Sequence, residues 1–197
     1  MQSVLPSDQR RPSPSDARPL MVNIGFIGVM LVVLLALRVY FVEVVPEVTG
    51  DLSAGNRLAY ALKCCAPIFL LIAIQISIVS IGRLKNPSLN PLLGVETVTE
   101  KVNIRVLQNT IEQTLLFVPA NCISALYFTD GRQLTLCAIT VFLFLTARVI
   151  FWVGYLKSWK FRTPGMAGTA FINFVLGWYA WGNVFNDLYQ GTLFELK

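Results

Sequence analysis

Five long stretches of apolar residues, separated by short polar connections, organise the chain. They cover residues 20–42, 58–82, 104–128, 134–156 and 166–185. Each stretch has roughly the 20 residues that a helix needs to cross a bilayer core of about 30 Å, and none alternates as a membrane-spanning strand would. Because backbone amides in hydrocarbon must be hydrogen-bonded within their own segment, the pattern predicts five transmembrane α-helices.

The polar connections hold the residues that turns require. The four residues 129–132, Thr-Asp-Gly-Arg, leave so little room that we expect the third and fourth segments to form an antiparallel helical hairpin. Residues 1–19 are polar, basic and rich in proline, which predicts a disordered tail. The expected organisation is this tail, an anchor helix over 20–45 and a four-helix membrane domain over 58–190. A composition of 55% hydrophobic and 14% charged residues agrees with a membrane protein.

The distribution of charge predicts an orientation. With the N-terminus in the cytoplasm, that side collects most of the basic residues: Arg10, Arg11, Arg18, Arg83, Lys85, Lys101, Arg105, Lys157, Lys160 and Arg162. Because cytoplasmic loops are enriched in lysine and arginine, we expect the N-terminus inside and the C-terminus outside. The net charge of +5 is then a topology signal that also attracts anionic membrane lipid. It predicts no nucleic-acid partner.

Histidine is absent, and all four cysteines lie in apolar segments. The lack of histidine excludes Ser-His and Cys-His catalysis, histidine-ligated haem and most zinc sites, so no metal site is predicted. We interpret the thiols as small hydrophobic side chains.

Polar residues inside the third and fourth segments are the strongest functional signal, because a charge at the centre of a membrane helix costs about 2.5–3.5 kcal/mol. The third segment carries Arg105, Gln108, Asn109 and Glu112, and the fourth carries Arg148 and Tyr155. Glu112 and Arg148 each lie eight residues from a cytoplasmic helix end, which is a depth of about 12 Å. We therefore expect a buried Glu112–Arg148 ion pair, with Asn109 satisfying a remaining donor.

Two interpretations of these residues compete. In the first, Glu112 and Arg148 only fix how the helices pack. In the second, they brace a cavity whose mouth presents Arg105, Tyr155, Lys160 and Arg162 to an anionic ligand. We favour the cavity, since intramembrane charges commonly mark functional sites.

The same residues resemble the signature of the MAPEG family, the membrane-associated proteins in eicosanoid and glutathione metabolism. The resemblance covers about residues 58–185 and is carried by Arg105 with the following residues to Thr114, by Arg148 to Tyr155, and by Arg162 with Gly165. It implies an all-α membrane protein in which a four-helix bundle, here preceded by one extra transmembrane helix, assembles as a homotrimer. Glutathione is then held between subunits near the cytoplasmic side.

The resemblance also implies roles for individual residues. It assigns glutathione binding to Arg105, Asn109, Glu112, Arg148, Tyr155 and Lys160. It assigns catalysis to Tyr155 and Arg162, which would help transfer the glutathione thiolate to a lipophilic electrophile from the membrane. The chain departs from the family pattern at Lys101, where a glutamate is common, and at Gln108, where an arginine is frequent.

The extra first segment and residues 56–66 resemble the five-span, mattrin-like members of the family. These members belong to secretory and endosomal membranes, so the endoplasmic reticulum, Golgi or endosomes are expected. They imply an alternative function, a non-catalytic regulator of receptor trafficking or Wnt signalling that contacts other membrane proteins. A transporter or channel has least support, because the sequence shows no internal repeat.

The last apolar segment carries small and polar residues whose positions predict packing. Gly165, Gly168, Gly177 and Gly182 are expected where helices approach closely. Asn173 is expected to reach either the polar site or a neighbouring subunit.

Overall fold

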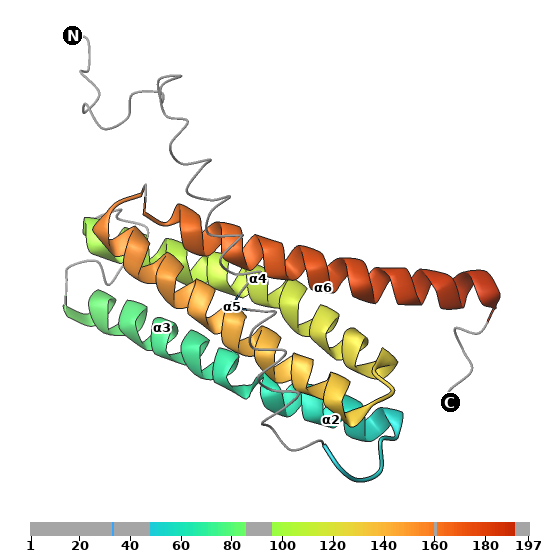
Figure 1. Ribbon diagram of the computed structural model, residues 1–197. Helices are drawn as coiled ribbons and strands as arrows, with labels where there is room; N and C mark the ends of the chain where they lie inside the picture. The colour runs from blue at the N-terminus through green and yellow to red at the C-terminus, as the bar shows by residue number, and fades with distance from the viewer. Residues whose placement is uncertain (1–32, 34–47, 86–95, 160, 192–197) are drawn as a thin grey trace, which may run out of the picture.

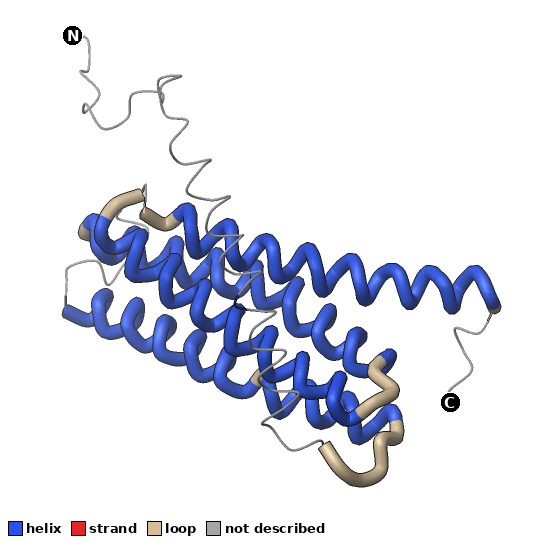
Figure 2. Tube along the Cα trace, viewed as in Figure 1, coloured by secondary structure: helices blue, strands red, loops and turns tan. Residues whose placement is uncertain are grey.

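A computed structural model describes residues 33, 48–85, 96–159 and 161–191 of the 197-residue chain. The elements in these residues are the helices α2 (Ala54–Cys64), α3 (Ala66–Lys85), α4 (Val98–Tyr127), α5 (Gly131–Lys157) and α6 (Thr163–Gln190). Figure 2 shows the described part as helices joined by loops, without strands. The predicted tail over 1–19 and the predicted anchor helix over 20–45 lie outside the described residues, apart from the single residue 33.

In the described residues the helices form a bundle of four passes, with α2 and α3 as two parts of one pass (Figure 1). Helices α4 and α5 lie together in the middle. Helix α6 packs against both on one side, and α2 and α3 pack against both on the other. The predicted all-α bundle and the predicted antiparallel hairpin of the third and fourth segments are confirmed.

Local signals fix where the helices begin. At the start of α4, the Thr97 hydroxyl accepts a hydrogen bond from the Glu100 amide at 3.2 Å, and the Glu100 carboxylate accepts one from the Thr97 amide at 2.7 Å. This reciprocal capping starts α4 at Val98, six residues before the apolar stretch that predicted it. Helix α5 begins after Asp130, whose carboxylate accepts a hydrogen bond from the Arg132 amide.

The segment predicted over 58–82 is interrupted at Cys65, which separates α2 from α3. Pro67 follows two residues later; it has no amide hydrogen to donate to the preceding turn, and its ring clashes with the carbonyl four residues back. The Ile68 amide bonds instead to the Cys65 carbonyl at 2.9 Å. One predicted helix is therefore two helices with a joint.

The lengths and surfaces of the helices agree with a membrane environment. Residues 54–84 and helix α5 are both long and apolar enough to cross a bilayer. Helices α4 and α6 have 30 and 28 residues, which corresponds to about 45 and 42 Å. The outer surface exposes many large apolar side chains, among them Leu70, Leu115, Phe142, Phe174 and Trp178. Such a surface would be an aggregation liability in water and is suited to lipid.

The end of the bundle where α4 turns into α5, called here the hairpin end, is tied by two polar contacts. The Arg57 guanidinium of α2 donates to the Phe128 carbonyl at 2.7 Å, just beyond the C-terminus of α4. The Tyr127 hydroxyl donates to the Asp187 carboxylate of α6 at 2.7 Å. A cation at a helix C-terminus also interacts favourably with the helix dipole.

Inside the bundle, α5 and α6 approach closely at one glycine. A Cβ atom on Gly165 would collide with the backbone of Phe151 and Ala147 on α5. Gly165 and Gly168 are buried, as expected of packing positions. The described residues show no such close approach at Gly177 or Gly182, where a Cβ would meet none of their atoms within 4 Å.

This contrast gives a matched pair of variants. We expect Gly165→Ala to destabilise the protein by about 1–3 kcal/mol, because α5 and α6 must move apart. Gly177→Ala should be neutral or stabilise by up to about 1 kcal/mol, since alanine is the better helix former and has open space there. Thermal unfolding of the two purified variants beside the parent measures both effects. Equal midpoints for the two variants would contradict the close contact at Gly165.

Candidate functional site

A polar pocket of about 330 Å³ lies at the end of the bundle opposite the hairpin end. It is formed by α4, the last turns of α5 and the first turn of α6, and it is lined by Arg105, Gln108, Asn109, Glu112, Phe151, Tyr155, Arg162 and Met166. Five of the predicted site residues therefore surround one space. Of the other two, Arg148 lies behind the pocket wall, and Lys160 is outside the described residues.

Helix α4 supplies one wall of the pocket. Its four polar residues recur at positions i, i+3, i+4 and i+7, so they share a face of the helix. Arg105, Gln108 and Glu112 are exposed, and the Gln108 amide donates to the Glu112 carboxylate at 3.3 Å. Asn109 is half-buried and points its side-chain oxygen at Arg148. The wall thus presents charges outward and an amide inward.

Arg148 is the largest fully buried side chain in the described residues. Its Nη2 atom donates to Asn109 Oδ1 at 3.1 Å and to Thr110 Oγ1 at 3.0 Å. The guanidinium carbon also lies 4.2 Å from the centre of the Phe151 ring, a favourable arrangement for a desolvated cation. These contacts connect the centre of α5 to α4.

The predicted ion pair between Glu112 and Arg148 is wrong. Glu112 is exposed at the pocket and is bonded to Gln108, while the arginine is bonded to the neutral side chains Asn109 and Thr110. Glu112 shares its helix face with Asn109, but it is rotated by about 60° from it, which is enough to carry the carboxylate to the surface. The part predicted for Asn109, a partner for the buried charge, is confirmed.

Sequence reasoning missed Thr110. Its signal was its spacing from the buried Val106 and Phe117, at i−4 and i+7, which places it on the inner face of α4. A small hydroxyl in an apolar run draws less attention than a charge, although the side chain accepts the bond from Arg148 and donates to the Val106 carbonyl at 2.8 Å.

A short turn between α5 and α6 supplies the opposite wall. A Cβ on Gly154 would collide with the Phe161 carbonyl, so glycine is required for the turn to fold back onto α5. This places the Arg162 guanidinium carbon 4.9 Å from the centre of the Tyr155 ring. The Tyr155 ring also meets Phe151 edge-on, with centres 5.8 Å apart. Tyr155 is thereby held between an aromatic ring and a cation.

The charges around the pocket favour an anion that also carries a positive group. Arg105 and Arg162 face one acidic residue, Glu112, and guanidinium groups bind carboxylates well. Tyr155 lines the pocket and its hydroxyl forms no hydrogen bond with another described residue, so the hydroxyl is available as a donor to a ligand.

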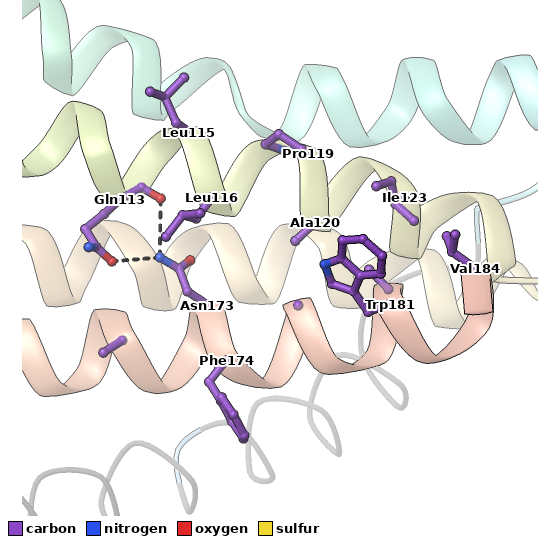
Figure 3. A pocket seen from close by; sticks show the side chains of 13 residues that line it. Gln113, Leu115, Leu116, Pro119, Ala120, Ile123, Asn173, Phe174, Trp181 and Val184 are labelled. Atoms are coloured by element: carbon purple, nitrogen blue, oxygen red, sulfur yellow. Dashed lines mark hydrogen bonds between the residues drawn. The ribbon is translucent and has the colours of Figure 1, made fainter. Parts of the chain in front are cut away.

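A second, mainly apolar cavity of about 630 Å³ lies farther along the groove between α4 and α6. Its lining includes Gln113, which directly follows Glu112 of the polar pocket on α4, and Ala170, which lies four residues after Met166 of that pocket on α6. Figure 3 shows Gln113 and Asn173 toward one end and Trp181 and Val184 toward the other. The two cavities therefore follow one another along the same pair of helices.

Asn173 belongs to this second cavity. Its amide donates to the side-chain oxygen of Gln113 at 2.8 Å and to the Gln113 carbonyl at 3.3 Å (Figure 3). The expected contact of Asn173 with the polar pocket is not found among the described residues, and its expected contact with a neighbouring subunit stays a prediction. The side chain joins α6 to α4.

The hydrogen bond between Arg148 and Thr110 can be tested with two threonines one turn apart. We expect Thr110→Val to destabilise the protein by about 1.5–3 kcal/mol, the range for a hydrogen bond to a charged group. Thr114→Val is the control, because the Thr114 hydroxyl bonds only to the Thr110 carbonyl of its own helix. Its loss should stay below about 1 kcal/mol. Chemical denaturation of both variants measures the difference, and equal losses would refute the proposed importance of Thr110.

The sequence was compared with family models, curated proteins and solved structures. No curated protein and no solved structure matched the chain. A family model described as the MAPEG family matches residues 61–182, which are more than half of the chain and include all of α3, α4 and α5. The protein is therefore a member of the MAPEG family.

Proposed function

We propose that the protein binds glutathione, or a closely related anion, in the polar pocket and transfers its thiolate to a lipophilic electrophile. The observation that carries this proposal is the convergence of Arg105, Asn109, Glu112, Tyr155 and Arg162 on a single pocket. Glutathione has two carboxylates, one ammonium group and one thiol. Two arginines, one glutamate and one tyrosine hydroxyl are complementary to these four groups.

Each residue has a role in the proposed complex. Arg105 and Arg162 bind the carboxylates, and Glu112, which is exposed at the pocket, binds the ammonium group. The Tyr155 hydroxyl donates a hydrogen bond to the sulfur. Arg148 holds Asn109, and with it the α4 wall, in place. The family resemblance also implies a ligand-binding role for Lys160, which lies outside the described residues.

The reaction follows from the chemistry of the thiol. Nearby cations favour the thiolate, and the thiol proton leaves to solvent. The sulfur then forms a bond to the electrophilic carbon, and the electrons of the bond that breaks go to the leaving group or to the opened ring. A hydrogen bond from Tyr155 keeps the thiolate in position for this attack.

The apolar cavity supports the second substrate. Its position next to the polar pocket on the same two helices allows a ligand from the membrane to place its reactive end beside the sulfur. The sides of the cavity are Leu116, Ile123, Phe174 and similar groups, so an acyl or aromatic compound fits better than a polar one.

The pocket is open along one side, where Arg105, Gln108 and Glu112 are exposed. A neighbouring copy placed there would complete it, which supports the homotrimer that the family resemblance implies. We also propose that the site faces the cytoplasm and that the protein resides in the endoplasmic reticulum, Golgi or endosomal membrane. The basic residues near the pocket, Lys101, Lys157 and Arg162, support this orientation.

A non-catalytic regulator of receptor trafficking or Wnt signalling is the second candidate. It is favoured by Gln108, which lines the pocket where the family often has an arginine and so removes one cation from the ligand. In this function the bundle is a scaffold for other membrane proteins. Tyr155→Phe would then leave activity intact, whereas changes on the lipid-facing surface would abolish it.

Glutathione binding to the purified protein tests the first proposal. We expect Arg105→Ala and Arg162→Ala each to weaken binding by about tenfold or more, since each removes a charged hydrogen bond. Tyr155→Phe should leave the affinity within a few-fold and lower the rate of conjugation by about tenfold or more. Arg132→Ala, an exposed arginine at the hairpin end, is the control. Absence of glutathione binding by the parent protein would end the proposal.

A bulky side chain in the apolar cavity tests whether the electrophile and glutathione occupy different sites. We expect Gly177→Phe to raise the KM for a lipophilic electrophile such as chlorodinitrobenzene by about tenfold, with unchanged glutathione affinity, because the ring fills the cavity. Gly182→Phe is matched, since that glycine also has open space but does not line the cavity. Identical kinetics for the two variants would remove the cavity from the proposal.

A further inference from the structure

Five side chains of the described residues carry buried polar atoms without hydrogen-bond partners, and two of these side chains, Gln75 and Arg148, are themselves almost fully buried. Gln75 of α3 is 2% exposed, and neither its Oε1 nor its Nε2 atom has a partner. Arg148 of α5 is 0% exposed, and its Nε and Nη1 atoms are likewise buried and unpaired. Buried polar atoms in native proteins are nearly always paired, so an additional bound species is indicated.

Counting residues along the helices places Gln75 and Arg148 at a similar level of the bundle. A Cβ on Gly82 of α3 would lie 3.5 Å from the Glu100 side chain of α4, which fixes the level of these antiparallel helices. Seven residues before Gly82 on α3 is Gln75, and seven residues after Glu100 on α4 is position 107. Gln75 therefore lies at the level of position 107, within one helical turn of Thr110. The Thr110 hydroxyl is bonded to Arg148 on α5, and α3 contacts both α4 and α5.

The layer is closed to bulk water. On the side of the hairpin end lie Phe117 and Phe144, stacked with ring centres 4.4 Å apart and both fully buried. On the side of the polar pocket lies Phe151, which is 2% exposed and packs against the arginine. Bulk water therefore cannot supply the hydrogen bonds that the unpaired polar atoms in this layer lack.

The arginine charge is also uncompensated within the described residues. Its hydrogen bonds are to Asn109 and Thr110, which are neutral. Glu112 is exposed, and the Glu100 carboxylate is occupied by Thr97 at the start of α4. An isolated buried cation is unfavourable, because its loss of hydration must be offset by an opposite charge or by several acceptors.

We infer that a small monovalent anion, such as chloride, binds in the interior of the bundle between Gln75 and Arg148. The unpaired atoms are three nitrogen donors, Gln75 Nε2 and Arg148 Nε and Nη1, and one acceptor, Gln75 Oε1. Water offers as many donors as acceptors and brings no charge. A halide ion only accepts, and it neutralises the arginine. The anion joins α3 to α5 directly behind the Asn109 wall of the polar pocket.

Thermal unfolding of the purified full-length protein in different sodium salts tests the site. At constant ionic strength, chloride and bromide should raise the midpoint of unfolding in a saturable manner relative to gluconate, an anion too large for the interior. Gln75→Leu should increase the apparent dissociation constant for the halide by about tenfold, since one hydrogen bond to the ion is lost. Equal midpoints of the parent in the three salts would overturn the inference.

A carboxylate introduced at position 75 should stabilise the protein without a halide, in contrast to Gln75→Leu, which should weaken halide binding. We expect Gln75→Glu to unfold at a higher temperature than the parent in gluconate and to lose the halide response, because the carboxylate takes the place of the ion. Gln190→Glu, at an exposed position on α6, should keep the parent's halide response. A lower midpoint for Gln75→Glu in gluconate would show that Gln75 and Arg148 do not share one space.

Anomalous diffraction from bromide-soaked crystals locates the ion directly. A peak between the two side chains is the expected result. Ordinary water density there without an anomalous peak would reject the anion and identify a hydrated layer instead.

Discussion

The buried guanidinium of Arg148 is the constraint on which the arrangement of the bundle depends. It cannot lose its proton at any ordinary pH, so the helices around it must supply acceptors and a stacking surface. Asn109 and Thr110 of α4 supply the acceptors, and Phe151 of its own helix supplies the ring. Since these residues are also neighbours of the pocket, the requirement to stabilise one charge fixes the wall that a ligand meets.

The pocket inherits its shape from two further features. One glycine, Gly154, lets the α5–α6 turn lie against α5, and another, Gly165, lets α6 begin in contact with the same helix. Together they bring Arg162 over Tyr155. A polar site inside an apolar bundle is therefore built by close backbone packing as much as by the polar residues themselves.

Most of the helices could be predicted from the sequence, because the length of an apolar run reports directly on a membrane-spanning helix. The beginning of α4 could not be predicted from hydropathy, since its first turn is polar; the Thr97 and Glu100 pair was the relevant signal. The interruption at Cys65 was marked by Pro67, yet apolar composition on both sides concealed it. Hydropathy reports how apolar a segment is. It does not report where the helical pattern of backbone hydrogen bonds is interrupted.

The residues of the site were predicted better than their pairing. Spacing along α4 placed Arg105, Asn109 and Glu112 on one face, and the pocket contains all three. Which of them meets Arg148 depends on a rotation of about 60° around the helix, which residue spacing does not resolve. Opposite charge favoured Glu112, whereas geometry selected the amide and the hydroxyl. Gly177 and Gly182 show the same limit, because a small residue signals close packing only when another helix lies beside it, and none of the described helices lies close to these two positions.

The joint between α2 and α3 determines how the bundle fits a bilayer. Helix α3 has 20 residues, a length of about 30 Å, which equals the thickness of a typical hydrocarbon core. Helix α2 carries Asn56, Arg57 and Lys63, and it packs against α4 and α5 beside the hairpin end. A helix of this length matches the core, so a thicker or thinner membrane would be met by a change in the tilt of the bundle or by local deformation of the bilayer.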